Sequence, residues 1–171
     1  MKILEQNGIE IENIDGAAFN HFCAGARSGV VPGVLNECPV LSASNNSVTV
    51  GTGELLISGF RVKLTEATVF SFSVAPVTDT QYYIIGTIDV SSDRTVSFSM
   101  SCVTTDNLTD EDIFHTEQGR YQIEVGRFLH KTDGSITDVV KTATLLLNNA
   151  LKIGSTIVTE QQIISLLNLL S

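Results

Sequence analysis

The spacing of hydrophobic residues changes its period near residue 34. From there to about residue 140, apolar and polar residues alternate, which is typical of strands with one buried face. Short clusters of Gly, Asn, Ser and Asp separate the alternating segments. The pattern predicts strands at Val40–Ala43, Ser47–Val50, Leu55–Leu64, Val69–Val74, Gln81–Val90, Arg94–Cys102, Tyr121–His130 and Ile136–Val140. Regularly spaced short strands predict a mainly β fold, either an antiparallel β-sandwich or a small barrel.

Turn residues lie between several of these segments and predict hairpins. Asn45-Asn46 is one such signal, because Asn adopts a positive φ more readily than other residues with a side chain. Ser91-Ser92-Asp93 and Thr132-Asp133-Gly134 are two further signals. We therefore expect each of the three to join neighbouring antiparallel strands.

The segment before residue 34 shows helical spacing instead. A short helix is predicted over residues 16–26, with Asp15 as the expected N-cap and Ser28-Gly29 as its end. Pro32-Gly33 is a predicted turn. The apolar face of the helix is formed by Ala18, Phe19, Phe22, Cys23 and Ala26. A short strand is predicted upstream, where Ile9, Ile11 and Ile14 alternate with polar residues.

The C-terminal segment predicts a second helix. Thr159 and Gln162 have the spacing of a capping box, and the residues that follow are apolar nearly all round. Such a helix must be buried, either against its own domain or in a seam between chains, or it is the start of a longer helical shaft. The predicted oligomer interface consists of Ile163, Ile164, Leu166, Leu167 and Leu170. The chain then divides into an N-terminal arm (1–32), a β-domain (33–144) and a linker with the C-terminal helix (145–171).

Composition narrows the classes of partner. With 171 residues, of which 43% are hydrophobic, the chain suits one domain with an appendage. A net charge of −9 with scattered basic residues disfavours nucleic acid and anionic membrane surfaces. No run approaches the roughly 18 apolar residues of a membrane span, and the first residues lack a signal-peptide pattern. We expect folding in a bacterial or host cytoplasm, with free thiols at Cys23, Cys38 and Cys102.

Candidate metal sites are weak in this sequence. His21 and Cys23 point to different faces of the predicted helix, and Cys38 is too isolated to complete a zinc site. Cys23 is better interpreted as a small core residue, with His21 facing solvent or a neighbouring chain. The acidic segment Asp106–Asp112 carries enough oxygens for calcium but lacks the spacing of an EF-hand, which favours a solvated loop.

Candidate catalytic and ligand sites are equally weak. A cysteine nucleophile at Cys102 would need His115 or His130 as a base, and nothing in the spacing requires their approach. Cys102 alternates with Met100 and Phe98, as a core residue would. Few aromatic residues and no Trp leave little material for a sugar-binding platform. The sequence therefore predicts no catalytic, cofactor-binding or metal-binding residues.

Three segments resemble bacteriophage tail and baseplate proteins. Residues 33–62 contain GVL, SVTV and the run Ile57, Gly59, Phe60, Arg61, Val62. Residues 81–103 and 120–140 are similar to the two hairpins that follow in that pattern, although 122–125 lacks the usual proline. The resemblance rests on the order of these three segments and on the spacing between them. It implies a virion component that is commonly a homotrimer, contacts other tail or baseplate proteins and has no catalytic residues.

We therefore expect a non-enzymatic structural component of a phage or prophage tail or baseplate, which presents rigid β-domains on a symmetric oligomer for host adsorption. The alternative is a receptor- or carbohydrate-binding module of the same particle, directed at a host cell-surface saccharide. A third hypothesis, an enzyme, requires a buried cluster joining His115 or His130 with Cys102 or the acidic loop.

Overall fold

Antiparallel sheets dominate the computed structural model, which describes residues 3–6, 8–24, 28–44, 46–143, 151–153 and 156–158. One sheet has the order β1 (Ile3–Gln6), β2 (Ile9–Glu12), β7 (Phe60–Leu64), β6 (Gly53–Ile57) and β3 (Gly29–Val30). A second has the order β10 (Val96–Val103), β9 (Thr80–Val90), β11 (Gly119–His130) and β12 (Ile136–Lys141). A third consists of β4 (Val40–Ser44), β5 (Ser47–Val50) and β8 (Thr68–Ser71). The predicted mainly β fold is confirmed.

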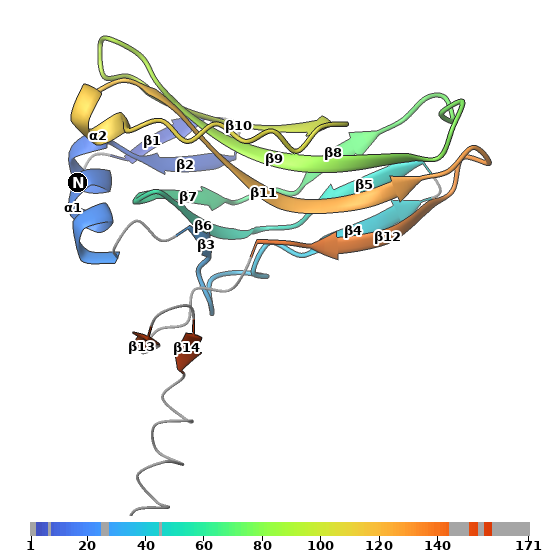
Figure 1. Ribbon diagram of the computed structural model, residues 1–171, viewed down its shortest axis with the longest axis horizontal. Coiled ribbons are helices and arrows are strands. Elements are labelled where there is room, and N and C mark those ends of the chain that lie inside the picture. Colours follow the sequence, from blue (N-terminus) through green and yellow to red (C-terminus); the bar gives the residue numbers. More distant parts are fainter. Residues whose placement is uncertain are drawn as a thin grey trace, which may run out of the picture.

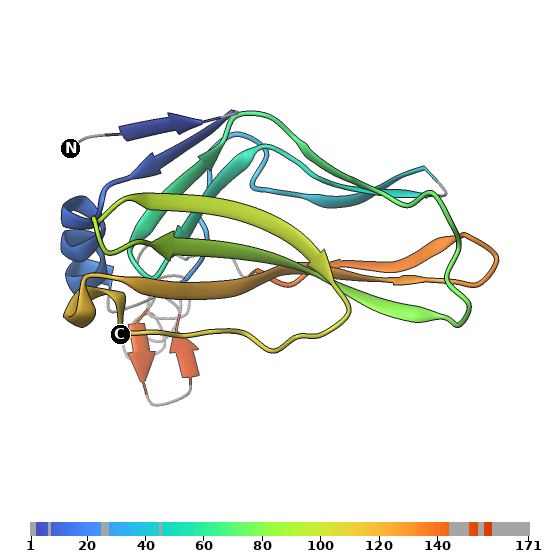
Figure 2. The ribbon, with the colours of Figure 1, turned by 90° about the horizontal axis from the view of Figure 1, so that it is seen from above.

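The four-stranded sheet forms one layer of a sandwich, and the five- and three-stranded sheets form the other (Figures 1 and 2). Two helices, α1 (Ile14–Ala24) and α2 (Ile113–Thr116), lie together at one end of the sandwich. The β11–β12 hairpin and the β8–β9 connection lie at the opposite end, which we call the distal end. The two ends of the sandwich therefore differ, with helices at one end and loops at the other.

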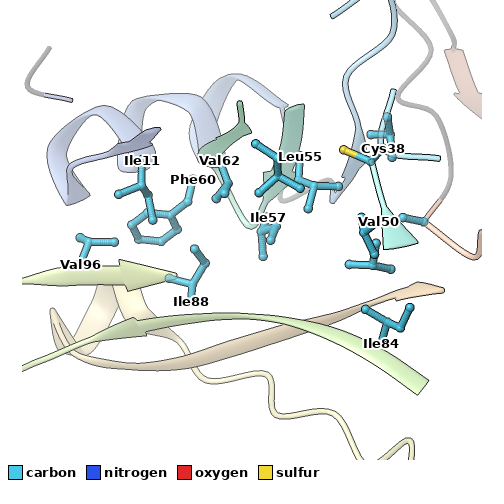
Figure 3. Close-up of a cluster of buried hydrophobic side chains, with 14 of the residues drawn as sticks. Ile11, Cys38, Val50, Leu55, Ile57, Phe60, Val62, Ile84, Ile88 and Val96 are labelled. Carbon is cyan, nitrogen blue, oxygen red and sulfur yellow. The ribbon is translucent and has the colours of Figure 1, made fainter. Parts of the chain in front are cut away.

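The core fills the space between the two layers. Figure 3 shows Leu55, Ile57 and Phe60 pointing toward Ile88 and Ile84 of the facing sheet. All five side chains are fully buried. Each such side chain contributes about 1.5–3 kcal/mol to stability relative to exposure. The predicted alternation produces this arrangement, because every second residue of a strand faces the same layer.

The N-terminal arm folds into the same core as the rest of the sandwich. Residues 1–32 supply β1, β2 and β3 to the five-stranded sheet, and β2 confirms the predicted short strand. The predicted helix exists but begins at Ile14, so Asp15 lies inside it and is not the N-cap. Asn13 caps it instead, since its Oδ1 accepts a hydrogen bond of 3.1 Å from the backbone N–H of Gly16.

The predicted single strand Leu55–Leu64 is wrong. The chain forms two antiparallel strands, β6 and β7, joined by a tight turn at Ser58-Gly59. Ser58 has φ +46° and Gly59 has φ +93°, the positive values that a two-residue hairpin turn of type I′ requires. The turn carries β7 back beside β6 and places both strands in the middle of the five-stranded sheet.

The predicted hairpins are confirmed, because β4 pairs with β5, β9 with β10 and β11 with β12. In two of the turns an aspartate accepts hydrogen bonds from residues two positions on. Asp93 Oδ1 accepts from Thr95 N–H at 3.1 Å, and Asp133 Oδ1 accepts from Ser135 N–H at 2.8 Å. Hydrogen bonds from Ser91 and Ser135, respectively, lower the pKa of these two carboxyls.

The sequence predicts a linker and then a helix at the C-terminal side. The part before the predicted helix contains a hairpin of β13 (Leu151–Ile153) and β14 (Thr156–Val158). The predicted helix after Thr159, with its interface residues, lies outside the described residues.

Candidate functional site

The acidic segment 106–112 does not gather its carboxylates. Asp112 Oδ1 accepts a hydrogen bond of 3.1 Å from His115 N–H and so caps α2, a helix that the sequence pattern did not predict. Glu111 Oε2 accepts one of 2.6 Å from Arg120 N–H on β11. Among the described residues, no three His, Cys, Asp or Glu side chains converge on a common point.

His21 is half-buried: part of its side chain meets solvent, as predicted, and the rest packs on its own chain. Its ring lies 4.5 Å from the ring of Phe114 on α2. Its Nδ1 atom lies 3.3 Å from the Ser58 carbonyl oxygen and 3.4 Å from Ser58 Oγ. The contact links α1 to the turn between β6 and β7, where Asn20 Nδ2 also donates a hydrogen bond of 3.1 Å to Gly59 O.

The pairing of His21 with Ser58 lies in a closed part of the structure, because Ser58 is buried. Which hydrogen bond the pair makes depends on the tautomer of the ring. A protonated Nδ1 donates to the Ser58 carbonyl oxygen, whereas an unprotonated Nδ1 accepts from Ser58 Oγ. Either hydrogen bond joins α1 to the turn. The pair therefore serves to anchor the helix to the turn.

Cys102 and His130 do not meet. Cys102 lies opposite Ile84, and His130 lies opposite Thr80 on the other side of β9. The two partners are four residues apart on β9, which separates them by roughly 13 Å along the strand. His115 instead lies near Asp112, with Nδ1 4.0 Å from Oδ2, and both side chains are exposed. The buried cluster that the enzyme hypothesis requires is not formed by these residues.

His130 occupies an aromatic cluster at the distal end. Its ring centroid is 4.8 Å from that of Phe72 and 6.1 Å from that of Tyr82. Tyr82 stacks in turn on Phe128 at 5.5 Å. His130 is fully buried, and neither of its ring nitrogens has a hydrogen-bond partner among the described residues. The cluster packs β9 and β11 against the segment that follows β8.

The two described thiols are free, as predicted, and both are poorly reactive. Burial is the main cause that raises the pKa of each to about 11, although the nearby Lys141 lowers that of Cys38. Cys102 packs against the core beside Met100 and Phe98, as its alternation predicted. The side chain of Cys23 lies outside the described part of the chain.

Slow thiol labelling is the expected consequence. In a Cys23→Ser background at pH 8, Ellman's reagent should modify Cys102 at about one hundredth the rate of an unfolded thiol or less, because the thiolate fraction falls tenfold for each unit of raised pKa. Cys38, which has no exposed surface, should react only after unfolding. The rate for Cys102 should rise with pH up to about 11. Labelling of both thiols in the folded chain at the unfolded rate would contradict this.

The outer face of the four-stranded sheet, the side turned away from the core, carries rows of polar residues. Asp89 and Arg120 are opposite each other and joined by a hydrogen bond of 2.7 Å from Arg120 Nε. Thr87 and Gln122 form the next row, with 3.0 Å between Gln122 Nε2 and Thr87 Oγ1. Exposed hydroxyl groups of Ser97 and Ser99 on the neighbouring β10 extend these two rows, and that of Ser101 extends the following row, which contains the buried Ile85.

Arg127 lies on this outer face in the distal half of the sheet. Its cross-strand neighbours are Tyr83 on β9 and Val140 on β12. Arg127 and Val140 are exposed, and Tyr83 is half-buried. Nothing in the sequence pattern brings these residues together, because their proximity depends on strand register.

The distal end also exposes apolar side chains. Val77 is 97% exposed and Val74 is 77% exposed, both in the connection between β8 and β9. The β11–β12 turn is nearby, since Gly134 lies beside Ala75. The loops of this end lie far from the two helices (Figure 2).

The fold defines the class of the protein as a mainly antiparallel β-sandwich. Comparison with protein-family models, with curated proteins and with solved structures found no match to this chain. None of the helices in the described part of the chain has the length and apolar character needed to cross a membrane.

Proposed function

We propose that this protein is a non-enzymatic structural component of a bacteriophage or prophage tail or baseplate, which presents a rigid β-domain on a symmetric oligomer for host adsorption. The observation that carries the proposal is the order of the three phage-like segments. Residues 33–62, 81–103 and 120–140 correspond to successive strands and hairpins of one sandwich. The resemblance thus follows the fold along the chain and is not scattered over unrelated loops.

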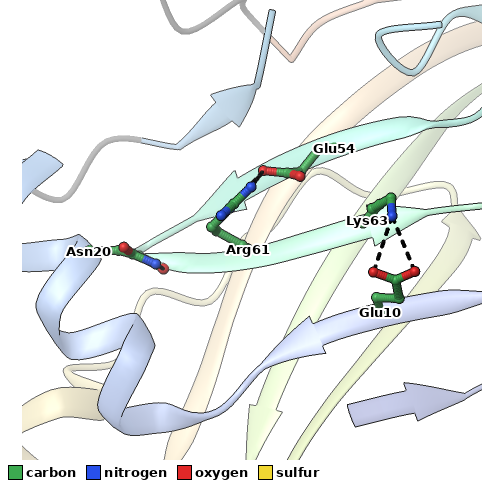
Figure 4. Close-up of polar contacts among 6 residues, drawn as sticks. Glu10, Asn20, Glu54, Arg61 and Lys63 are labelled. Atoms are coloured by element: carbon green, nitrogen blue, oxygen red, sulfur yellow. Dashed lines mark hydrogen bonds and ion pairs between the residues drawn. The ribbon is translucent and has the colours of Figure 1, made fainter. Parts of the chain in front are cut away.

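A rigid domain suits this role. β9 and β11 are paired from Gly119 to His130, so the centre of the four-stranded sheet is held by a long ladder. In the facing sheet, Arg61 and Glu54 join β6 to β7, and Lys63 and Glu10 join β7 to β2 (Figure 4). The loops at the distal end are therefore presented by a fixed frame.

The proposed oligomer is a homotrimer assembled through the C-terminal helix at Ile163–Leu170. A helix that is apolar nearly all round needs a partner surface, and neighbouring copies of the same helix supply one. Several copies of a weak binding surface on one stem raise the overall affinity without any new contact. Other tail or baseplate proteins are the further partners, and the virion is the proposed location.

The alternative function is a receptor- or carbohydrate-binding module of the same particle. The position of Arg127 opposite Tyr83 on the outer face favours it, because a charged side chain beside an aromatic ring suits a sugar that carries polar groups. The two functions are compatible if the same oligomer both builds the particle and contacts the host.

The test of the proposed function is the mass of the purified chain in solution, determined by light scattering. A trimer that becomes a monomer when the chain ends at Gly154 supports the proposal. A monomer in both forms contradicts it, because the helix would then pack on its own domain.

A further inference from the structure

Arg127 is the one arginine with a described side chain that has no hydrogen bond and no ion pair with another described residue. The other described arginines each have a carboxylate oxygen within 2.7 Å: Arg61 with Glu54, Arg94 with Asp15 and Arg120 with Asp89. The chain has a net charge of −9, so carboxylates are abundant. A guanidinium group that remains exposed and unpaired in such a chain is available to an external anion.

Strand register explains why Arg127 is unpaired. Arg120 and Arg127 both lie on the outer face of β11 and both lie opposite a residue of β9. Opposite Arg120 is Asp89, and the two form an ion pair. Opposite Arg127 is Tyr83, and on its other side is Val140 of β12. The cross-strand position that holds a carboxylate opposite Arg120 therefore holds a phenol ring opposite Arg127.

The backbone around Arg127 is irregular but firmly held. The pairing of β11 shifts register between Glu124 and Gly126 against β9, and between Arg127 and Leu129 against β12. Such bulges redirect side chains and recur next to binding sites. On the core side, Phe128 stacks on Tyr82. A hydrogen bond of 2.7 Å from Gln81 Nε2 to Phe128 O further ties β9 to β11.

We propose that Arg127 and Tyr83 form a binding site for a saccharide that carries carboxylate or phosphate groups. The guanidinium offers two parallel N–H donors, which match the two oxygens of a carboxylate or phosphate. The Tyr83 ring beside it offers an apolar face for the C–H surface of a sugar ring and a hydroxyl for hydrogen bonding. This inference rests on the proposed role in host adsorption and names the site and the ligand class.

The surroundings favour a saccharide over a protein partner. The exposed hydroxyl of Ser101 lies in the next row of the outer face and that of Ser99 in the row beyond it, and such groups suit a ligand rich in hydroxyls. Two partly exposed valines flank the pair: Val140, at 44% exposure, beside Arg127, and Val103 opposite Tyr83. A stable protein interface needs about 800 Å² per partner with an apolar centre. Two partly exposed valines supply little of that.

The acidity of the chain sets the conditions for binding. A net charge of −9 repels a polyanion at long range, but in 0.15 M salt charges further apart than about 8 Å are largely screened. One arginine gives a weak site, and several copies on one oligomer raise the overall affinity. The experiment therefore uses the full chain at physiological salt.

The test measures binding of the full chain, by biolayer interferometry, to four immobilised polymers. Polygalacturonate is a saccharide that carries carboxylates, and phosphomannan is a saccharide that carries phosphates. Neutral dextran, which lacks charge, is the control for the acidic groups. Polyglutamate, which lacks a sugar, is the control for the saccharide. We expect binding to at least one of the two acidic polyhydroxyl polymers, and at least tenfold weaker binding to dextran and to polyglutamate.

Matched variants assign the binding to the site. Arg127→Ala and Tyr83→Ala should each weaken binding at least tenfold. Arg120→Ala removes another exposed guanidinium from the same face and should change binding less than twofold. Arg127→Lys should recover only part of the loss, because an ammonium lacks the paired donors. Unfolding midpoints verify that each variant is folded.

Several results would overturn the inference: no binding to either acidic polyhydroxyl polymer, equal binding to dextran, or equal loss in Arg120→Ala and Arg127→Ala. Equal binding to polyglutamate would also overturn it and would point to an acidic protein partner. The mass of the full chain separates this inference from the proposed function. A trimer without binding removes the inference alone, whereas a monomer that binds removes the proposed assembly alone.

Discussion

Replacing Gly59 with Ala should destabilise the fold by about 3 kcal/mol. Two causes add. Gly59 has φ +93°, which a residue with a Cβ adopts at a cost, and its Cβ would lie 2.3 Å from the carbonyl oxygen of Ala17. That oxygen belongs to α1, so the helix would have to move away from the turn. Thermal unfolding at fixed protein concentration should show a midpoint lowered by roughly 10 °C.

Gly33→Ala is the matched control for this prediction. Gly33 also has a positive φ, +73°, but a Cβ there would meet nothing within 4 Å. Gly33→Ala should therefore lower the stability only by the cost of the positive φ, about 1 kcal/mol. Equal destabilisation by the two substitutions would mean that α1 does not pack against the β6–β7 turn as described.

Replacing Arg61 with Ala should destabilise the fold by about 2–3 kcal/mol. The Glu54 side chain is only 5% exposed, and Arg61 reaches its Oε1 atom through Nε at 2.8 Å and Nη2 at 2.7 Å (Figure 4). Without Arg61 a buried carboxylate loses its charged partner. The free energy of unfolding from urea titrations measures the loss.

Two further variants isolate the cause. Lys63→Ala removes an ion pair of the same sheet in which both side chains are about a third exposed, and it should cost less than about 1 kcal/mol. Glu54→Gln in the Arg61→Ala background removes the unpaired charge and should restore part of the stability. If Lys63→Ala and Arg61→Ala have the same effect, burial of Glu54 is not what makes its pair important.

Local signals in the sequence were sufficient for the hairpins, because residues such as Asp93 and Asp133 form their turns with neighbours two positions away. The Ser58-Gly59 turn was missed although the signal was present. Leu55 and Ile57 are buried at odd positions, whereas Phe60 and Val62 are buried at even positions. That change of phase, with a glycine at the point of change, indicates a turn inside an otherwise continuous alternation.

The start of α1 could not be settled from the sequence alone. Asn13 and Asp15 both have side chains that cap helices, and only the course of the backbone selects Asn13. The short helix α2 was missed for a related reason. Its single turn carries no periodic pattern, and it is held by the Asp112 cap and by the burial of Ile113.

The outer-face site depended on register, which the sequence did not specify. Arg127 faces Tyr83 only because β11 contains a bulge between Glu124 and Gly126. The trace of that bulge in the sequence is another change of phase, since Val125 and Phe128 are both buried although they are three positions apart. The sequence also does not specify which strand pairs with β11, because strand pairing is set by the packing of whole sheets.

The measurement that tests the proposed assembly most directly is the solution mass of the full chain beside variants of its C-terminal helix. Light scattering should give three times the chain mass for the unmodified protein. Leu166→Lys with Leu170→Lys should give the mass of one chain, because charges replace the apolar seam. Ser165→Lys with Asn168→Lys, which adds the same charges at polar positions, should leave the trimer intact. A single-chain mass for the unmodified protein, or trimers in all three samples, would contradict assembly through this helix.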